Sequence, residues 1–499
     1  MMEEKLHDRT EDRVQALESA AGGAGLMARG KKKETLTPEE RLQAALVPER
    51  EQPYPVPGNW CWTYIKSGFD VTSSKRVHKE DWLLQGIPFY RTRELVKLSE
   101  AGYVDNELFI SEKLYSSFAE EYGIPQNGDL LISGVGTIGI PYVINGNQKF
   151  YFKDGNIIWF KNRGIFHPKY VYFLYKSVFI DNQIHQMSSG TTVDTYTIIN
   201  ANFTIVPLPP LPEQQRIVDR IESLFAKLDE AKQKAQDALD SFETRKAAIL
   251  HKAFTGELTA QWRKEHGVGM ESWETHELIE CFEIVSGIQK TPARSPKDNP
   301  IPYLAVANVY RDKIDLSDIR YFEVTPEELE KLKLQDKDIL IVEGNGSGNE
   351  IGRCAMWHNE LPLCIHQNHI IRMRSKTADV FPEYVLYYLN SQAGKATMQE
   401  RAKTTAGLFN LSAGKVKTIP LPFASLPEQT EIVRILDDLL AKEQQAREAA
   451  EEVLEQIDLI KKAILARAFR GELGTNDPGE ESAVELLKTR KSTGFSKIN

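Results

Sequence analysis

A glycine-rich turn is the first motif in the chain whose spacing could do chemistry. Gly134-Val-Gly-Thr-Ile-Gly139 has the spacing of a loop that holds the phosphates of a dinucleotide, and it follows a strand-like run. Such a loop needs a helix directly after it, because the helix N-terminus supplies the N–H groups that bind phosphate. Here Pro141 and another strand-like run follow, and Gly344-Asn-Gly-Ser-Gly348 stands at the corresponding place further along. We therefore predict a glycine turn between strands and not a cofactor site.

The other catalytic motifs are incomplete. The chain contains no Gly-Lys-Ser or Gly-Lys-Thr, which a P-loop requires, and its histidines lack the His-Glu-x-x-His spacing of a zinc site. Asn299-Pro-Ile-Pro-Tyr303 comes near the Asn-Pro-Pro-Tyr of adenine methyltransferases, but an isoleucine interrupts it. His366 and His369 enclose Gln367 and Asn368, a cluster that a hydrogen-bonded loop explains better than a metal. We predict no catalytic residue and no metal ligand.

Polar and basic residues in the predicted loops are the candidates for binding. Arginine binds guanine, and asparagine or glutamine binds adenine, through paired hydrogen bonds in the major groove, while Ser, Thr and Lys suit phosphates. For any one of these residues a solvated surface position is the simpler explanation. As a set in two divergent regions they indicate a DNA-recognition surface. The candidates are Lys75, Arg76, Arg91, Arg93, Thr137, Ser188, Ser189, Thr191, Thr192, Gln289, Lys290, Arg294, Asn308, Arg311, Asn345, Ser347, Asn349, Lys403 and Thr404.

These loops belong to two stretches of short strands. In each, apolar runs alternate with glycine, asparagine and aspartate turns, and a tryptophan begins the stretch. A short helix is expected after Thr37-Pro38, an N-cap followed by a proline at the first helical position. The predicted organisation is a flexible N-terminal tail with that short helix (1–59), a first β-rich unit (60–206), a first helix region (207–258), a linker (259–272), a second β-rich unit (273–419), a second helix region (420–473) and a polar C-terminal tail (474–499).

One long segment occurs twice. Residues 212–258 and 427–473 both begin Pro-Glu-Gln, end Gly-Glu-Leu and align without a gap. In each, apolar residues recur at alternating steps of three and four, which is a heptad seam that Arg245 interrupts in the first copy and Glu443 in the second. A helix of about 40 residues is roughly 60 Å long, and its seam is most simply buried against the other copy in an antiparallel pair. Two independent surface helices are the alternative. The seam residues are Ile217, Ile221, Leu224, Leu228, Ala235, Phe242, Ile249, Ile432, Leu436, Leu439, Ala450, Ile457 and Ile464.

Composition limits the class of protein. A chain of 499 residues exceeds a single core and predicts several domains. The sequence has no apolar run long enough to cross a membrane, its N-terminus lacks the apolar core of a signal peptide, and its four cysteines lack Cys-x-x-Cys spacing, so we expect a cytoplasmic protein with reduced thiols. The net charge of −9 gives no support for nucleic-acid binding, so a DNA surface must be a local patch or be supplemented by a partner.

The duplicated boundary resembles a known family. The run Pro-Leu-Pro-Pro-Leu-Pro-Glu-Gln at 207–214, feeding a long helix that ends Phe-x-Gly-Glu-Leu, is similar to the specificity subunits of Type I restriction–modification enzymes, the HsdS family. The resemblance runs from Trp60 to Leu473. It includes Ser-Gly-Thr-Thr at 189–192 and Gln261-Trp262-Arg263, and the second copy is looser at 404–407 and 422–426.

The resemblance implies a fold and a role. The fold would be α+β, with two β-rich target recognition domains separated by two long antiparallel coiled-coil helices in a pseudo-two-fold arrangement. Each domain would read one half of a bipartite sequence in double-stranded DNA. The helices would set the spacer and dock two methyltransferase subunits, and restriction/translocase subunits would join through the complex of a bacterium or archaeon. Adenosylmethionine, ATP and magnesium would act in those partners, with no cofactor bound by this chain.

Two other functions stay open at the level of sequence. One is a coiled-coil scaffold with two protein-binding domains, and the other is a self-sufficient adenine DNA methyltransferase. Methylation by the purified chain alone would establish the methyltransferase. A sequence-specific gel shift with the partner methyltransferase and a bipartite target separates the DNA-reading subunit from the scaffold.

Overall fold

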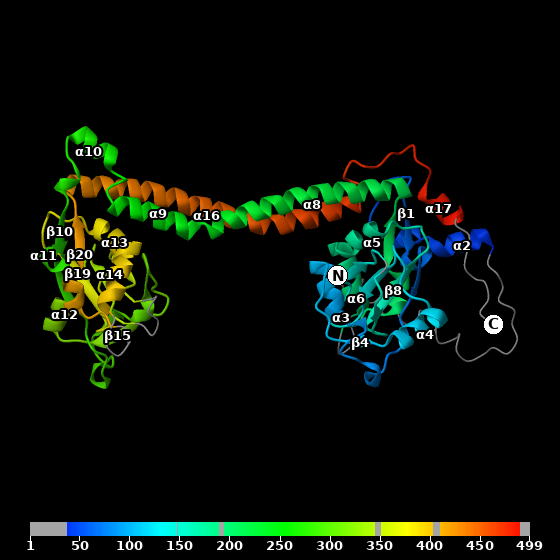
Figure 1. The fold of residues 1–499 in the computed structure, drawn as a ribbon, viewed down its shortest axis with the longest axis horizontal. Helices are drawn as coiled ribbons and strands as arrows, with labels where there is room; N and C mark the ends of the chain where they lie inside the picture. The colour runs from blue at the N-terminus through cyan, green and yellow to red at the C-terminus, as the bar shows by residue number, and fades with distance from the viewer. Residues whose placement is uncertain (1–36, 147, 189–193, 345–350, 403–409, 490–499) are drawn as a thin grey trace. The chain divides into compact units, whose positions relative to one another are not determined.

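The chain folds into two compact units. The computed structural model describes residues 37–146, 148–188, 194–344, 351–402 and 410–489. Unit 1 combines the N-terminal part of the chain, through Leu228, with the part from Asp458 onward, and unit 2 is Asp229–Ile457 (Figure 1). Both ends of the described chain therefore belong to unit 1. The long helices begin in one unit and end in the other.

The described part of unit 1 contains three small sheets. A four-stranded antiparallel sheet has the order β2-β8-β5-β6, a three-stranded sheet has the order β4-β3-β7 with β3 and β7 parallel, and β1 pairs with β9. Short helices cover these sheets. The elements are α2 (Pro38–Ala45), β1 (Cys61–Tyr64), β2 (Phe69–Thr72), β3 (Ile87–Tyr90), α3 (Thr92–Ala101), β4 (Phe109–Ile110), α4 (Glu112–Tyr122), β5 (Leu130–Ser133), β6 (Pro141–Val143), β7 (Tyr151–Phe152), β8 (Ile157–Asn162), α5 (Pro168–Tyr175), α6 (Val178–Ser188), α7 (Ile198–Phe203), β9 (Ile205–Leu208) and α17 (Ala483–Thr489).

Unit 2 repeats this topology. Its four-stranded sheet has the order β11-β19-β16-β17, its three-stranded sheet has the order β15-β12-β18 with β12 and β18 parallel, and β10 pairs with β20. A short hairpin, β13-β14, is an addition. The elements are α10 (Ala260–His266), β10 (Glu274–Glu277), α11 (Leu278–Cys281), β11 (Phe282–Ser286), β12 (Pro300–Leu304), β13 (Val309–Tyr310), β14 (Lys313–Ile314), β15 (Arg320–Glu323), α12 (Pro326–Leu332), β16 (Ile339–Val342), β17 (Cys354–Met356), β18 (Ile365–His366), β19 (Ile370–Ser375), α13 (Pro382–Asn390), α14 (Gln392–Ala402), α15 (Ala413–Lys417) and β20 (Pro420–Phe423).

The central strands of each four-stranded sheet are buried on both faces. In β5, Leu130 and Ile132 face one hydrophobic cluster while Leu131 faces another, and Ile339 and Leu340 divide in the same way in β16. Because successive side chains of a strand point to opposite faces, burial on both sides explains why these strands read as unbroken apolar runs. Because these strands are packed on both faces, the turns that begin at their ends have defined starting positions.

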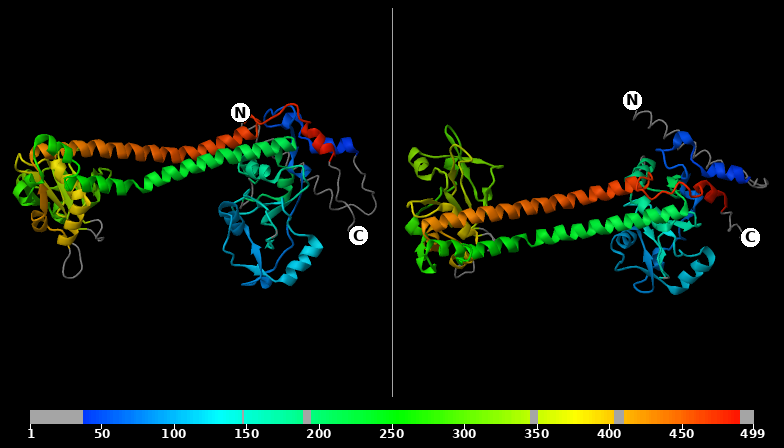
Figure 2. Two further views of the ribbon diagram at one scale, coloured as in Figure 1. Left: turned by 45° about the horizontal axis from the view of Figure 1, so that its top comes forward. Right: turned by 90° about the horizontal axis from the view of Figure 1, so that it is seen from above.

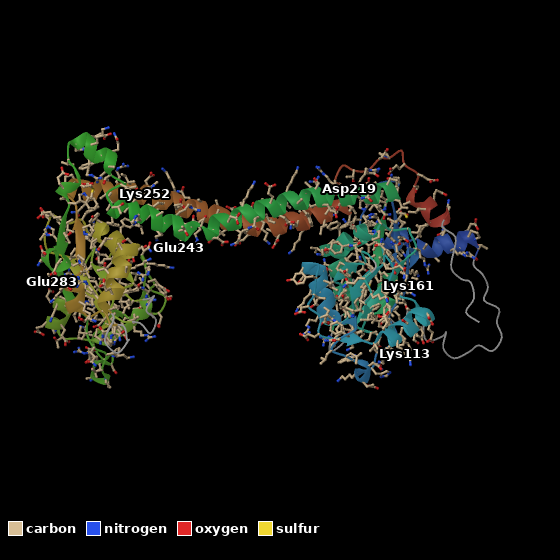
Figure 3. The ribbon with its side chains drawn as sticks, in the orientation of Figure 1. Lys113, Lys161, Asp219, Glu243, Lys252 and Glu283 are labelled. Atoms are coloured by element: carbon tan, nitrogen blue, oxygen red, sulfur yellow. The ribbon has the colours of Figure 1, made fainter. Side chains whose placement is uncertain are left out.

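The repeated segments form long helices. The first is α8 (Leu211–Asp240) followed by α9 (Phe242–Phe254), and the second is the uninterrupted α16 (Leu426–Ala468). Within unit 1 the start of α8 lies beside the end of α16, and within unit 2 the end of α9 lies beside the start of α16, so the helices are antiparallel in each unit (Figures 1 and 2). Charged side chains such as Glu243 and Lys252 of α9 stand on the helix surface (Figure 3).

The predicted seam residues differ in burial. All of them are buried or half-buried. Ile217, Ile221, Ala235, Phe242, Ile432, Leu436, Ala450 and Ile457 are buried, and Leu224, Leu228, Ile249, Leu439 and Ile464 are half-buried. Val453 and Ile460, which continue the same spacing, are exposed.

The two polar residues that interrupt the seam are partners. Arg245 Nε lies 2.8 Å from Glu443 Oε2, and the Arg245 guanidinium also donates to the carbonyl of Ala238, beside the break between α8 and α9 at Ser241. A polar pair inside an apolar seam fixes the register of two helices at a cost in stability. The two irregularities of the sequence are therefore one interaction.

The glutamine of each Pro-Glu-Gln motif fastens its helix to the adjacent unit. Gln214 and Gln429 are fully buried, and the side-chain amide of each spans three backbone groups of the preceding loops. The Gln214 amide oxygen accepts from His167 N at 2.7 Å, and its nitrogen donates to Ile165 O and Pro209 O. Gln429 does the same with Phe381 N, Asp379 O and Ala424 O. Each glutamine thus connects the start of its helix to the backbone of the adjacent loops through three hydrogen bonds.

The C-terminal segment differs from the polar tail expected from sequence. Residues 474–489, named here the closing segment, end in α17, which packs against α2. Ala483 is fully buried in the main core of unit 1, and Val484, Leu486 and Leu487 pack against that core. Four apolar residues on one short helix supply the buried face that a solvated tail lacks. The closing segment is therefore part of unit 1.

Candidate nucleic-acid interface

One end of the four-stranded sheet gathers the polar turns in each unit. In unit 1 these turns are residues 73–76 after β2, 134–137 after β5 and 153–156 before β8, named here edge 1. In unit 2 the equivalent turns are 287–290 after β11, 343–344 after β16 and 367–369 before β19, named here edge 2. Because the three strands are antiparallel neighbours, these turns meet at one end of the sheet.

Hydrogen bonds to backbone carbonyls connect the turns of edge 1. Gly134 N donates to Asn156 O at 2.8 Å, and the Ser73 hydroxyl donates to Ile157 O at 2.9 Å. The base of the turn at Gly134 also receives a hydrogen bond from Tyr196 N. Thr137 and Gly136 remain exposed at its tip. The exposed side chains of edge 1 therefore extend from turns that are hydrogen-bonded to one another.

Edge 2 is built in the same way. Ile288 N donates to His366 O at 3.1 Å, and Asn368 N donates back to Ile288 O at 2.9 Å. Gly287 is packed so closely that a Cβ there would lie 2.3 Å from two backbone carbonyl oxygens, so only glycine fits. Glu343 N donates to His369 O, and the His369 ring lies 3.4 Å from the Glu343 carboxylate.

The two edges carry different chemistry. Edge 1 has three cations, Lys75, Arg76 and Lys153, and one carboxylate, that of Asp154, which lies 3.3 Å from Arg76. Edge 2 is richer in amides. Its exposed positions include Gln289 and Lys290, with Asn368 and His369 beside them. Arginine and lysine suit guanine and phosphate, and amide side chains suit adenine.

The structure brings together only part of the predicted site. Lys75, Arg76 and Thr137 lie at edge 1, and Gln289 and Lys290 lie at edge 2, all exposed. Lys75 Nζ lies 5.0 Å from the centre of the Tyr122 ring. Eight further candidates fall outside the described residues, namely Ser189, Thr191, Thr192, Asn345, Ser347, Asn349, Lys403 and Thr404.

Arg91 and Arg93 are engaged in an ion-pair cluster beside edge 1. Both guanidinium groups bind Glu94, whose side chain is buried, and Arg93 also lies 2.6 Å from Glu107. Burial raises the pKa of the Glu94 carboxyl, but the hydrogen bonds from Arg91 and Arg93 outweigh it and hold that pKa at about 2. These arginines stabilise the start of α3, and their guanidinium groups are already matched with carboxylates.

Four other candidates have structural partners. Ser188 is buried and donates to Ile184 O, and Arg294 forms a two-bonded pair with Glu328. Asn308 is 4% exposed, accepts from Ala305 N and donates to Asp315 O and Asp318 O. Arg311 is half-buried and donates to Ile351 O. The prediction of DNA contacts is wrong for Asn308 and Ser188, because both side chains are buried.

Sequence reasoning missed the third turn of each edge. Lys153 and Asn156 precede β8, and Asn368 and His369 precede β19 at the equivalent place. The signal was available, since each of these turns directly precedes the strand that pairs with β5 or β16, the strands before the glycine-rich turns. Pairing register, which the sequence alone did not give, places them beside the other turns.

The glycine-rich turn after β5 lacks the helix that a dinucleotide site requires. The strand β6 begins at Pro141, so no helix N-terminus follows the glycine-rich turn. Across the described ranges, no group of three His, Cys, Asp or Glu side chains could hold a metal ion. In that same part of the chain, no helix is long and apolar enough to cross a membrane.

His366 makes unit 2 sensitive to acid. The ring is fully buried, its Nδ1 donates to Ile370 O at 2.9 Å, and burial together with the nearby Arg372 and Arg374 lowers its pKa to about 4. The unfolded chain takes up a proton below about pH 6.5 while the folded ring stays neutral, so stability is full above that pH and falls toward pH 4. From pH 7 to 5 we expect unit 2 to lose about 2 kcal/mol through this residue.

The measurement is urea unfolding at pH 7 and pH 5. His366→Asn removes the titrating group and should abolish this part of the pH dependence. His358→Asn is the matched control, because it makes the same substitution at an exposed histidine of unit 2. Equal pH dependence in the wild type and His366→Asn would contradict the expectation.

The structure thus contains one α+β topology twice, and long helices are attached to both copies. Each copy carries a polar edge, and the side chains of the two edges differ. This arrangement is that of a protein with two binding units of different specificity. The family model for the Type I restriction modification DNA specificity domain matches the chain twice, at residues 64–239 and 270–456. The chain belongs to this family, the specificity subunits of Type I restriction–modification enzymes. These subunits are non-catalytic components of their complexes.

Individual relatives agree with the family match. The chain is 30% identical over 333 residues to the specificity subunit of the Type I restriction enzyme EcoKI of Escherichia coli K12, covering 64% of this chain and 70% of the relative. It is 23% identical over 458 residues to the EcoBI specificity subunit of Escherichia coli, covering 86% and 90%.

Solved structures share the fold. The HsdS subunit from Thermoanaerobacter tengcongensis superposes with a TM-score of 0.61 at 19% identity, over 85% of this chain and 100% of that chain. A chain from a study of assembly and conformational transition in the type I R-M system gives 0.58 at 19% identity, over 84% and 100%. The predicted fold class, α+β with two β-rich recognition domains and two long helices, is confirmed.

Proposed function

We propose that this chain reads a bipartite sequence in double-stranded DNA, with edge 1 reading one half and edge 2 the other. The observation that carries the proposal is that one sheet end is built twice on the same frame and carries different polar side chains each time. A shared frame suits DNA of constant shape, and different side chains suit different bases. The cations of edge 1 also supply the local patch that a chain of net charge −9 requires.

The remaining parts of the proposed complex follow from the family. The paired helices would set the spacer between the half-sequences and dock two methyltransferase subunits, and restriction/translocase subunits would join through them. Adenosylmethionine, ATP and magnesium would be bound by those partners, in the cytoplasm of a bacterium or archaeon. The resemblance of the chain to whole specificity subunits supports this assignment.

The direct test is a map of methylated bases in cells that express this chain with its partner methyltransferase. We expect one bipartite motif that disappears when this chain is deleted. Purified complex should shift a duplex carrying that motif and leave a scrambled duplex unshifted. Methylation without any sequence motif would overturn the proposal, and methylation by the chain alone would favour the self-sufficient enzyme.

The edges give a sharper prediction. Replacing Lys75 and Arg76 together by alanine should weaken binding to the cognate duplex by about 10- to 100-fold and relax one half-sequence, because one base contact and one phosphate contact are lost. The half-sequence read by unit 2 should stay unchanged. Binding is measured by fluorescence anisotropy across a salt series, and the salt dependence should become shallower.

A matched control lies at the other end of the same sheet. Lys161 lies in the last two residues of β8 and Arg163 directly follows the strand, so their joint replacement by alanine removes the same charges away from edge 1 (Figure 3 shows Lys161). This control should keep both half-sequences. Equal losses in the two double variants would mean that edge 1 is not the reading surface.

A further inference from the structure

The glutamate of each Pro-Glu-Gln motif is a buried carboxylate with a segment of chain closed over it. Glu213 at the start of α8 and Glu428 at the start of α16 are both fully buried. A buried carboxylate needs charged or hydrogen-bonding partners to offset its lost hydration. The two sites, named here socket 1 and socket 2, obtain those partners from different segments.

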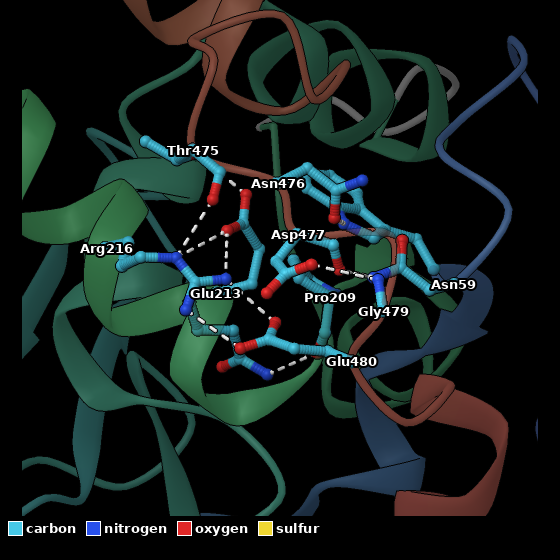
Figure 4. Close-up of polar contacts among 11 residues, drawn as sticks. Asn59, Pro209, Glu213, Arg216, Thr475, Asn476, Asp477, Gly479 and Glu480 are labelled. Atoms are coloured by element: carbon cyan, nitrogen blue, oxygen red, sulfur yellow. Dashed lines mark hydrogen bonds and ion pairs between the residues drawn. The ribbon is translucent and has the colours of Figure 1, made fainter.

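Socket 1 is filled by the closing segment, residues 474–489. The Thr475 hydroxyl donates to Glu213 Oε1 at 2.7 Å, and Arg216 lies 2.8 Å from Glu213 Oε2 (Figure 4). The same guanidinium donates to both carboxylate oxygens of Glu480 at 2.8 Å and to Thr475 O at 2.9 Å. Arg216 therefore joins the helix carboxylate to the carboxylate of the closing segment.

Further bonds hold the closing segment next to socket 1. Asn59 Nδ2 donates to Asp477 O at 3.0 Å, and Trp60 Nε1 donates to the side chain of Asn476 at 3.2 Å. Ala483 N then donates to Asn59 O at 2.9 Å, at the point where Ala483 enters the core. The protection of this last amide reports whether the segment is closed.

Socket 2 is filled by the linker that carries α10. The Thr259 hydroxyl donates to Glu428 Oε1 at 2.7 Å, as Thr475 does to Glu213. The guanidinium comes from Arg263 of the linker, which lies 2.5 Å from Glu428, and Trp273 Nε1 donates to the other carboxylate oxygen. The linker brings the positive charge itself.

The sockets therefore have opposite charge patterns. In socket 1 the arginine stands on the helix, three residues after the glutamate, and the closing segment is acidic. In socket 2 the aligned helix position is Glu431, which pairs with Arg434, and the arginine that meets the buried glutamate is Arg263 of the linker. The threonine and the buried glutamate are common to both sockets, whereas the arginine lies on the helix in socket 1 and on the linker in socket 2.

We propose that this exchange of charge makes each socket accept its own closing segment and reject the other. The closing segment in socket 2 would place Glu480 near Glu428 and Glu431, without Arg263 and with Arg434 already paired to Glu431. The linker in socket 1 would place Arg263 against Arg216. Like charges brought together at a buried site oppose such an exchange, whether it occurs within one chain or between two copies. This selection is independent of DNA reading.

The experiment is a charge-reversal cycle in the full-length chain. Glu480→Arg gives the closing segment a guanidinium, as Arg263 gives the linker. Arg216→Glu gives the helix of socket 1 a carboxylate at the position aligned with Glu431. Either single variant should speed hydrogen exchange at Ala483 by about tenfold or more. The double variant reproduces the charge pattern of socket 2 and should restore slow exchange. Glu481→Arg, an exposed neighbour, is the matched control and should exchange as the wild type does.

Two outcomes would overturn the proposal. One is a Glu480→Arg variant that exchanges no faster than Glu481→Arg. The other is a double variant that exchanges as fast as the faster single variant, because charge selection requires reciprocal rescue. If a single variant unfolds unit 1 as a whole, the double variant still decides, since only matched charges would refold it.

Discussion

One heptad inserted after Ala235 in α8 together with one after Ala450 in α16 is expected to lengthen the spacer of the DNA target by about three base pairs. Seven helical residues add about 10 Å, and each base pair of DNA occupies about 3.4 Å. Seven residues also preserve a heptad seam, so the helices should pack as before. Because edges 1 and 2 are untouched, both half-sequences should remain the same.

The measurement is the methylated-base map of cells carrying the lengthened chain and its partner subunits. An insertion of two residues at the same places is the control. It turns the following part of each helix by about 200° and moves the seam away from its partner, so methylation should be lost. An unchanged spacer, or altered half-sequences with the heptad insertion, would mean that the helices do not set the distance.

The repeated elements could be predicted because their signals are local and periodic. The heptad pattern defined both long helices, and even its two faults, Arg245 and Glu443, proved to be partners 2.8 Å apart. The strands of the four-stranded sheets were visible as apolar runs because burial on both faces removes polar residues from them. Because the segment occurs twice, each copy supported the prediction made from the other.

The recognition surface was predicted only in part because it depends on pairing register. Residue type alone could not distinguish Lys75, exposed at edge 1, from Asn308, whose side chain serves three backbone groups. The closing segment was missed for a related reason. Its partners Asn59 and Arg216 lie hundreds of positions away in the chain, and no periodicity marks contacts of that kind.

The second large effect is expected at socket 2. Glu428→Gln should lower the unfolding free energy of unit 2 by about 3–5 kcal/mol. The glutamine keeps the shape of the side chain but removes the charge that faces Arg263, whose side chain is 7% exposed. A guanidinium left buried without its carboxylate loses the attraction that offset its dehydration. The Thr259 and Trp273 donors lose a charged acceptor as well.

Hydrogen exchange of β16 and β19 measures this loss, because the amides of these central strands open only when unit 2 unfolds. Glu431→Gln is the control. Its ion pair with Arg434, whose side chain is 66% exposed, is screened by solvent and should contribute little to stability. The two substitutions make the same chemical change three residues apart on one helix, so they compare a buried carboxylate and its partners with a more exposed ion pair. Similar exchange rates in both variants would show that socket 2 does not hold unit 2 together.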